Sequence, residues 1–103
     1  MKVLVTGGSG LIGRAVIHEL MNNNIDVRSM DLTKNNTNGI ENYVGSILDV
    51  NSVNQAVRGC DTVIHLAAKL GVKRTETHRL ETLNLNIQGT VNILEACVKN
   101  DIK

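Results

Sequence analysis

MKVLVTGGSGLIG, residues 1–13, decides the fold of this chain. The apolar run Val3–Val5 predicts a buried strand, and glycines follow it at positions 7, 10 and 13. Gly7 permits a tight turn at the strand end, and Gly10 has no Cβ, so the backbone can approach a pyrophosphate. Gly13 lies one turn into the following helix and lets that helix pack against the strand. The stretch therefore predicts a strand, a glycine-rich turn and a helix in succession.

The first turn of that helix is a predicted binding site for an anion. The first amides of a helix have no internal partner and lie at the positive end of its dipole, so a phosphate bound there satisfies both. Glycines also occur in ordinary turns, and a purely structural turn is the alternative. The strand before the glycines and the helical pattern after them favour a dinucleotide site.

Asp31 is the second candidate residue for dinucleotide binding. Apolar residues alternate with polar ones from Ile25, which predicts a second strand that ends at Asp31, 18 residues after Gly13. An acidic residue at about this spacing binds the 2′-hydroxyl of an adenosine ribose, and a strand-end or turn aspartate is the alternative. A carboxylate there would repel a 2′-phosphate, so we expect NAD rather than NADP, although Arg28 and Lys34 would weaken that repulsion.

The composition limits the classes of function. The 103 residues allow one domain, here residues 1–103, and 11 basic residues balance 10 acidic ones in an interspersed pattern. We therefore expect no nucleic-acid partner and no membrane partner. Cys60 and Cys97 are far apart without metal-type spacing, so we expect no metal site and two thiols in a reducing cytoplasm, with a disulfide as the alternative.

The remaining pattern details the first helix and predicts two more helices and two more strands. Ile12, Val16 and Leu20 predict one face of the first helix, and residues 33–39 predict a loop. A third strand covers about residues 41–44, and a short helix follows with a capping-box spacing at Ser52 and Gln55. Asp49 before it is expected to be a cap or turn residue rather than a catalytic acid.

The fourth strand, residues 62–66, is an apolar run typical of a parallel sheet covered on both faces. His65 within it is expected to be a packed, hydrogen-bonded residue rather than a base. A long helix over about residues 76–100 carries an apolar stripe with spacings of three and four residues. Gly89 interrupts that helix, which predicts a close backbone approach. With right-handed crossovers, the elements give an α/β Rossmann-type parallel sheet in the order 3-2-1-4 with helices on both faces.

Three motifs in order identify a family resemblance. They are TGGSGLIG at residues 6–13, HLAA at residues 65–68 and NIQGTVN at residues 86–92. With these, the chain resembles the extended short-chain dehydrogenases/reductases, and more narrowly the NAD-dependent epimerases and dehydratases that act on nucleotide sugars. The resemblance runs through the whole chain.

The resemblance implies a role for each matching residue. The amides of Leu11 and Ile12 would hold the pyrophosphate of NAD, and Asp31 would bind the adenosine ribose. The other implied contacts are Ile47 beside the adenine, Leu66, Ala67 and Ala68 along the nicotinamide side, and Asn86 from the long helix. One departure is local: the family has Gly-Asp before the adenine contact, and here Ser46 follows Gly45.

The catalytic motif of the family is not found in this chain. Its chemistry needs a tyrosine four residues before a lysine, whereas the single tyrosine, Tyr43, is followed at that distance by Ile47. We therefore expect no catalytic residue here and an inactive piece, truncated before the fifth strand, with the substrate domain absent. Such a piece would leave residues 63–66 on an apolar edge, which predicts self-association.

Two functions remain as hypotheses. The first is the NAD-binding portion of a cytoplasmic nucleotide-sugar epimerase or dehydratase, homodimeric when complete, which transfers hydride to and from a bound nicotinamide. The second is a non-catalytic NAD(P)-binding module that senses redox state. A fragment that folds poorly and binds nothing is the third possibility. A Tyr-x-x-x-Lys motif downstream would favour the first.

Overall fold

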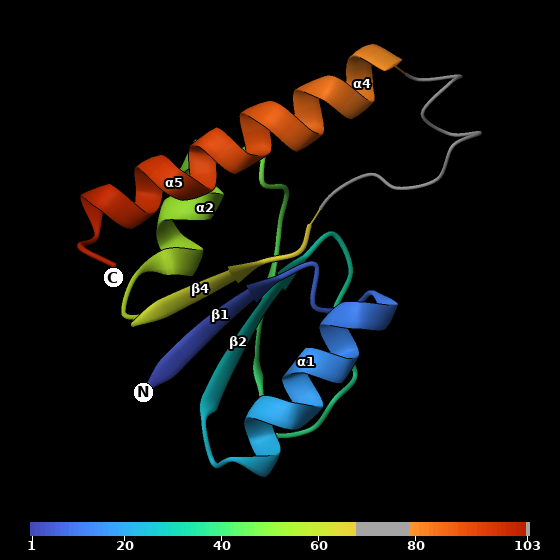
Figure 1. Ribbon diagram of the computed structural model, residues 1–103, viewed down its shortest axis with the longest axis vertical. Helices are drawn as coiled ribbons and strands as arrows, with labels where there is room; N and C mark the ends of the chain where they lie inside the picture. The colour runs from blue at the N-terminus through green and yellow to red at the C-terminus, as the bar shows by residue number, and fades with distance from the viewer. Residues whose placement is uncertain (68–78, 103) are drawn as a thin grey trace.

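The computed structural model describes residues 1–67 and 79–102. This part of the chain forms a four-stranded sheet in the order β3-β2-β1-β4, from β1 (Lys2–Thr6), β2 (Asp26–Asp31), β3 (Glu41–Val44) and β4 (Thr62–His65). All neighbouring strands are parallel. The predicted order 3-2-1-4 is confirmed. Figure 1 shows α1 (Leu11–Asn22) on one side of the sheet, and α2 (Val50–Val57) with α5 (Gly89–Lys99) on the other.

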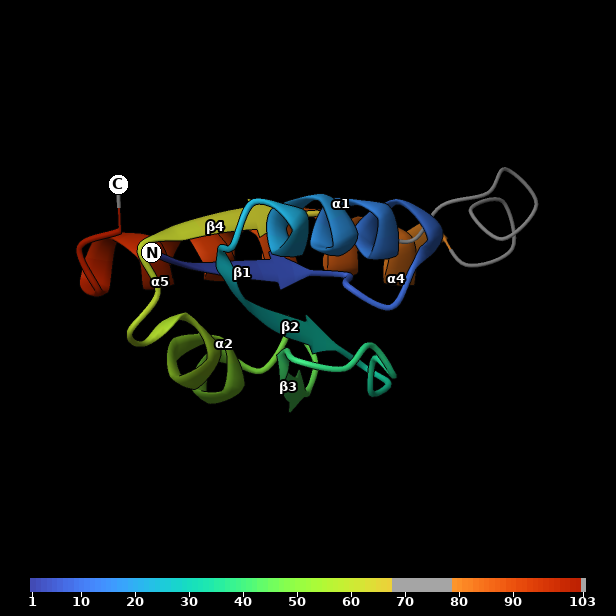
Figure 2. The same ribbon diagram turned by 90° about the horizontal axis from the view of Figure 1, so that it is seen from below.

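The two faces of β1 enter two separate cores. Val3 and Val5 pack with Ile17 on the α1 side, whereas Leu4 packs with residues of α2 and α5 on the other side. The turned view of Figure 2 shows the layers of helix, twisted sheet and helix. An apolar run without alternation is therefore buried on both faces, as a central parallel strand requires.

The buried face of α1 differs from the predicted one. Gly13 and Ile17 are its buried residues, Val16 and Leu20 pack at the margin of the core, and Ile12 is exposed. The predicted stripe was thus wrong at Ile12. The helix packs closely at Gly13 on the backbone of the turn that follows β1, at Gly7 and Gly8, and Ile12 then faces outward.

The amino end of α2 is capped by Asp49, which confirms the cap expected there. Its carboxylate accepts hydrogen bonds from the amides of Asn51 and Ser52 at 3.1 and 3.3 Å. The predicted capping box of Ser52 and Gln55 is wrong, because the helix begins at Val50 and Ser52 already lies in its first turn. Gln55 instead accepts a hydrogen bond from the hydroxyl of Tyr43.

The long carboxyl-terminal helix has three described segments. They are α4 (Arg79–Leu83), the π-helical turn η1 (Asn84–Gln88) and α5, and they follow one another along one axis in Figure 1. The predicted beginning of this helix at residue 76 lies outside the described residues. Its apolar side chains at 80, 83, 87, 91, 94 and 98 are 41–83% exposed, so the stripe does not face the core.

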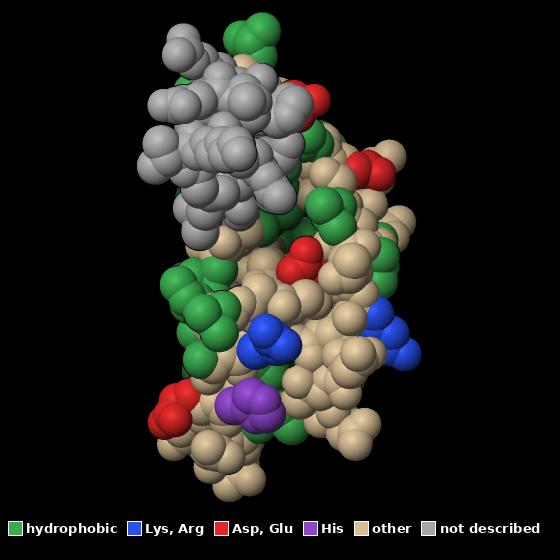
Figure 3. Space-filling view, turned by 90° about the vertical axis from the view of Figure 1, so that its right-hand side faces the viewer, with side chains coloured by type: hydrophobic (Ala, Val, Ile, Leu, Met, Phe, Trp, Pro, Cys, Tyr) green, Lys and Arg blue, Asp and Glu red, His purple; other side chains and the backbone are tan. Residues whose placement is uncertain are grey.

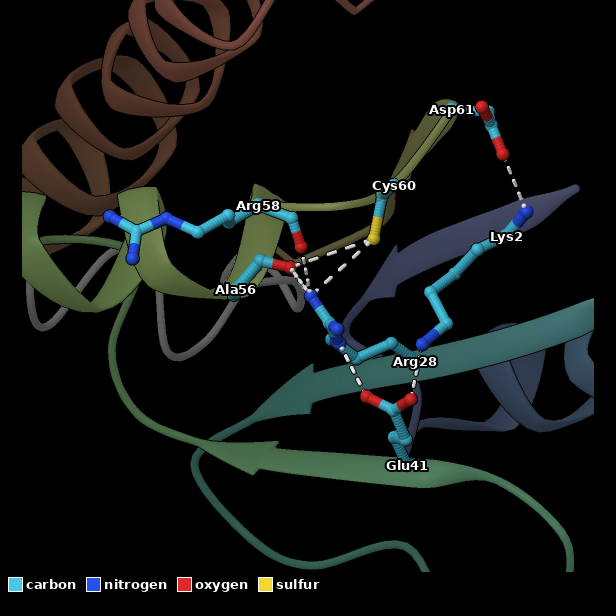
Figure 4. Close-up of polar contacts among 7 residues, drawn as sticks. All are labelled: Lys2, Arg28, Glu41, Ala56, Arg58, Cys60 and Asp61. Carbon is cyan, nitrogen blue, oxygen red and sulfur yellow. Dashed lines mark hydrogen bonds and ion pairs between the residues drawn. The ribbon is translucent and has the colours of Figure 1, made fainter.

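A polar network, drawn in Figure 4, links the first residues of β1 and β3 to β2 and α2. Arg28 donates from Nε to Glu41 at 2.8 Å and from Nη1 to the carbonyls of Ala56 and Arg58, both at 2.7 Å. Lys2 also pairs with Glu41, and these two partners, Lys2 first, hold the pKa of the Glu41 carboxyl below its ordinary value. Arg28 thus ties β2 to the carboxyl end of α2.

Cys60 and Cys97 are free thiols, as predicted, and burial raises the pKa of both. In the described ranges, no group of His, Cys, Asp and Glu side chains is arranged to hold a metal ion. Nor does any helix within those ranges have the length and apolarity needed to cross a membrane.

Candidate dinucleotide-binding site

A cavity of about 630 Å³ opens at the carboxyl ends of β1, β2 and β4. It brings together nine of the eleven predicted site residues, namely Gly7, Gly10, Leu11, Ile12, Gly13, Asp31, Ile47, Leu66 and Ala67. Ala68 lies outside the described residues. Asn86 lies in η1 and is not part of the cavity wall, although its neighbour Leu85 is. In open α/β sheets, ligands bind at this end of the strands.

The glycines differ in what they are needed for. Gly7 has a φ of +73° and packs on β4, where a Cβ would lie 2.9 Å from the amide of Ala67. A Cβ on Gly13 would lie 2.1 Å from the carbonyl oxygen of Gly7, so the predicted close packing of helix and strand is confirmed. Gly10 is different, because the nearest described atom to its Cβ would be the Gly7 oxygen at 3.4 Å. The fold therefore tolerates a side chain at Gly10.

A fourth glycine of the turn was not assigned a role from the sequence. A Cβ on Gly8 would lie 2.1 Å from Ser29 Oγ, a buried hydroxyl on β2 with no hydrogen-bond partner among the described residues. Gly8 is thus required by packing under the turn. The pairing of β2 with β1 places Ser29 beneath Gly8. No pattern in the sequence predicts this contact.

The amino end of α1 faces the cavity with uncapped amides. Gly10 is the N-cap, and within the described structure no side chain caps this end. The side chains of Leu11 and Ile12 are 81% and 62% exposed, while both residues still line the cavity. Unpaired amides at the positive end of a helix dipole are suited to bind a phosphate.

The carboxylate of Asp31 is oriented by the backbone. Oδ2 accepts a hydrogen bond from the amide of Ser9 at 3.0 Å, and Oδ1 accepts one from the amide of Leu32 at 2.7 Å. Each oxygen retains a lone pair for a further donor. Asp31 therefore lines the cavity with its negative charge held in one orientation beside the glycine turn.

The predicted loop at residues 33–39 contains a further residue of the site, Asn35. Its side chain is 3% exposed and donates to the carbonyl of Gly8 at 2.8 Å, and its Oδ1 accepts from the amide of Thr37. Ser9 Oγ adds a hydrogen bond to the carbonyl of Thr33 at 3.0 Å. The Gly8–Ser9 peptide is thus held at both ends, by Asn35 at its carbonyl and by Asp31 at its amide.

Ile47 forms the opposite wall and is held by the long helix. Its carbonyl accepts a hydrogen bond from Asn92 Nδ2 at 2.9 Å. A Cβ on Gly89 would lie 2.3 Å from Ile47 Cδ1, so the predicted close approach at Gly89 is confirmed. Beside it, Ser46 lines the cavity and its hydroxyl accepts from the amide of Leu48 at 3.1 Å.

His65 and Tyr43 occupy the structural positions expected for them. His65 lines the cavity, makes hydrogen bonds through both ring nitrogens, and burial lowers its pKa. Tyr43 lies on β3, and the cavity wall as described does not include it. Figure 3 shows charged side chains scattered among apolar and polar ones on the face that it draws, as the interspersed charges predict.

The class follows from these features. A parallel sheet in this order, a glycine-rich β1–α1 turn with free amides and an oriented acid at the end of β2 define a Rossmann-type dinucleotide-binding fold. Residues 3–103 match the family described as the NAD dependent epimerase/dehydratase family, and the chain belongs to it.

Similar proteins agree with this assignment. The UDP-N-acetyl-alpha-D-glucosaminuronate decarboxylase of Bacillus cytotoxicus is 38% identical over 99% of this chain and 34% of its own length. A putative UDP-glucose 4-epimerase of Methanocaldococcus jannaschii is 35% identical over 97% of this chain and 35% of its own. The NAD complex of the Thermus thermophilus UDP-glucose 4-epimerase superposes with a TM-score of 0.92 at 29% identity, over 100% of this chain and 35% of that one. The chain thus spans about a third of the length of these relatives.

Proposed function

We propose that this chain is the NAD-binding portion of a nucleotide-sugar epimerase or dehydratase. The observation that carries the proposal is the cavity at the carboxyl ends of the strands, which gathers the glycine turn, the free amides of α1 and the oriented Asp31. When bound, NAD would supply a nicotinamide that accepts and returns a hydride. The residues of this chain bind and orient it.

The proposed roles follow the walls of the cavity. The amides of Leu11 and Ile12 bind the pyrophosphate, Gly10 leaves room for its close approach, and Gly7 and Gly13 shape the turn and the packing of the helix beside it. Asp31 accepts a hydrogen bond from the adenosine ribose. The remaining proposed contacts are Ile47 against the adenine, Leu66, Ala67 and Ala68 along the nicotinamide, and Asn86 from η1.

The electrostatics favour NAD over NADP. Two amides fix the carboxylate of Asp31, so it cannot turn away from a 2′-phosphate without losing them. Arg28, one of the two cations that lie three positions from Asp31 in the sequence, is bound to Glu41 and to the end of α2. A 2′-phosphate would therefore meet an oriented negative charge while that guanidinium is bound elsewhere.

Calorimetric titration of NAD and NADP into the full chain and into Asp31→Asn tests this proposal. We expect the amide to weaken NAD binding about tenfold, as loss of a charge-assisted hydrogen bond predicts, and to narrow the preference over NADP. Asp26→Asn, at the exposed beginning of the same strand, is the matched control and should bind NAD as the parent does. A folded parent that binds neither cofactor contradicts the proposal.

We propose that the conversion of a nucleotide sugar is carried out by a longer protein of which this chain is the NAD-binding portion. The similar proteins act on UDP sugars by their names, so a nucleotide sugar is the proposed substrate class. A non-catalytic redox-sensing module is the alternative. A longer protein that carries a downstream Tyr-x-x-x-Lys and converts a nucleotide sugar with NAD supports the enzyme, and one that binds NAD without turnover supports the sensor.

We also propose that the protein is cytoplasmic, because a reducing compartment keeps thiols such as Cys60 and Cys97 free. We further propose that two copies pair through the exposed apolar stripe along α4, η1 and α5. The six residues of this stripe, Leu80, Leu83, Ile87, Val91, Leu94 and Val98, all have exposed side chains along α4, η1 and α5. The same stripe on a second copy is self-complementary about a two-fold axis. Sedimentation should show a dimer that Leu94→Glu dissociates. Val50→Glu is the control, because Val50 is an exposed apolar residue of α2 outside the stripe, and this variant should remain a dimer.

A further inference from the structure

A chain of hydrogen bonds joins β1, β4 and the π-helical turn through His65. Thr6 Oγ1 lies 2.6 Å from His65 Nδ1, and His65 Nε2 lies 3.1 Å from Thr90 Oγ1. The hydroxyl of Thr90 in turn donates to the carbonyl of Asn86 at 2.6 Å. The chain thus runs from the end of the central strand to the turn that carries Asn86.

The donors and acceptors allow only one direction of proton donation along this series of hydrogen bonds. Thr90 Oγ1 directs its proton to the carbonyl of Asn86, so it accepts from His65 Nε2, and a neutral ring then carries its proton on that nitrogen. Nδ1 of the same ring accepts from the Thr6 hydroxyl. Thr6 Oγ1 itself accepts from the amide of Ala67 at 3.2 Å and, at 3.0 Å, from the amide of Leu66, which is shared with the Thr6 carbonyl oxygen at 3.1 Å.

We propose that Thr6, His65 and Thr90 form a positioning relay, which holds the turn carrying Asn86 against the strand ends and requires neutral His65 protonated at Nε2. π-Helical turns within α-helices are frequent at functional sites and need support, because their geometry is uncommon. Here Gly89 against Ile47 supports one side of the turn and the relay supports the other. The relay rests on the proposed NAD-binding function only for its effect on affinity.

A second proton on the ring would break the relay. It would sit on Nδ1 and face the Thr6 hydroxyl, whose own proton points to that nitrogen and whose oxygen already accepts from two backbone amides, one of them shared with the Thr6 carbonyl. The charged residues on β1 and α5, the two elements that supply the hydroxyls, are Lys2, Glu95 and Lys99. Asp61 lies just before β4, and Asp31 lies on the cavity wall. Burial is the cause of the lowered pKa of His65. The groups that face the ring nitrogens directly are the two threonine hydroxyls.

Two measurements on the full chain test the relay. The ring ¹⁵N shifts of His65 at neutral pH, without cofactor, should report a proton on Nε2 and none on Nδ1. Titration of NAD into Thr90→Val should show affinity reduced about five- to tenfold, the value of one hydrogen bond. Thr90→Ser keeps the hydroxyl and should restore most of the affinity, which loss of packing alone would not predict.

Thr82→Val is the matched control. Thr82 lies on α4, is buried, and its hydroxyl has no hydrogen-bond partner among the described residues. The same change there should leave NAD affinity unaltered.

A proton on Nδ1, or a folded Thr90→Val that binds NAD as the parent does, overturns the relay. If the parent binds no NAD, the proposed function fails instead. The ring shifts then still decide the relay, as they do if Thr90→Val fails to fold.

Discussion

Gly10→Ala should separate the needs of the fold from those of the ligand. Gly10 has φ −76° and ψ 174°, extended backbone that alanine adopts without strain. Its added Cβ would meet the Gly7 carbonyl oxygen at 3.4 Å, an ordinary van der Waals distance. Within the described structure, nothing closer opposes the methyl group. A requirement for glycine at position 10 would therefore come from a bound molecule.

The expected change in folding stability is small because two effects oppose each other. Alanine is a poorer N-cap than glycine by roughly 0.5–1 kcal/mol. It also restricts the unfolded chain, which stabilises the fold by about 0.4–1 kcal/mol. The free energy of unfolding should thus change by less than about 0.5 kcal/mol. By contrast, a methyl group that displaces a phosphate from one amide forfeits about 1.5–3 kcal/mol, a ten- to hundredfold loss of NAD affinity.

Gly13→Ala provides the opposite pattern. Its Cβ would lie 2.1 Å from the carbonyl oxygen of Gly7 and 2.8 Å from Gly8 Cα, both backbone atoms that cannot rotate away. Overpacking of this kind costs about 1–3 kcal/mol or more, of which the better helix propensity of alanine returns about 1 kcal/mol. We expect Gly13→Ala to be clearly destabilised.

Urea unfolding and calorimetric NAD titration of both variants form the assay. The reasoning is refuted if Gly10→Ala unfolds as readily as Gly13→Ala, because the backbone at position 10 would then be strained. It is equally refuted if Gly10→Ala is stable and binds NAD as the parent does, because no ligand would then approach that position.

Three further predictions concern the surroundings of the cavity. Asn35→Asp keeps the acceptor for the Thr37 amide but loses the donor to Gly8, so titration should show weaker NAD binding than with Asn36→Asp, an equal charge on the exposed neighbour. The folded form of His65 has a lowered pKa, so the folded state binds fewer protons than the unfolded state just below pH about 6.5. Stability should therefore fall as pH drops through that window in urea unfolding, and His65→Gln should fall less. Gly89→Ala should lower the free energy of unfolding, because its methyl group would clash with the end of the Ile47 side chain. Ile47→Val removes Cδ1, so in a double-mutant cycle it should restore part of that free energy. Additive changes in the two variants would contradict the contact.

The two ends of the sheet are built for different tasks. At the amino end, Arg28 and Lys2 satisfy Glu41, and Arg28 also satisfies the last carbonyls of α2. At the carboxyl end, the amides of α1 are left uncapped beside an oriented acid. The charged groups of the first end are thus paired with one another, whereas those of the second line the cavity that contains the glycine turn.

By itself, the sequence determined the strand order, the glycine turn and most of the cavity. These follow from local rules: an apolar run is buried on both faces, and parallel strands joined by right-handed crossovers can pair in few ways. Glycine spacing marks where the backbone must come close, so Gly7, Gly13 and Gly89 were placed correctly before any contact was known.

Only the tertiary structure decided which polar residues hold that cavity in shape. Asn35 lay in a polar loop like its neighbours, and its contact with Gly8 spans 27 positions in the chain. For a similar reason, the pattern placed Ile12 on the inner face of α1, whereas the structure buries Gly13 and Ile17 there. The close approach at Gly13 sets the rotation of the helix about its axis. Thr90 and His65 are 25 positions apart and meet only when α5 packs on β4. Such contacts depend on the distance between elements, which the period of a pattern does not encode.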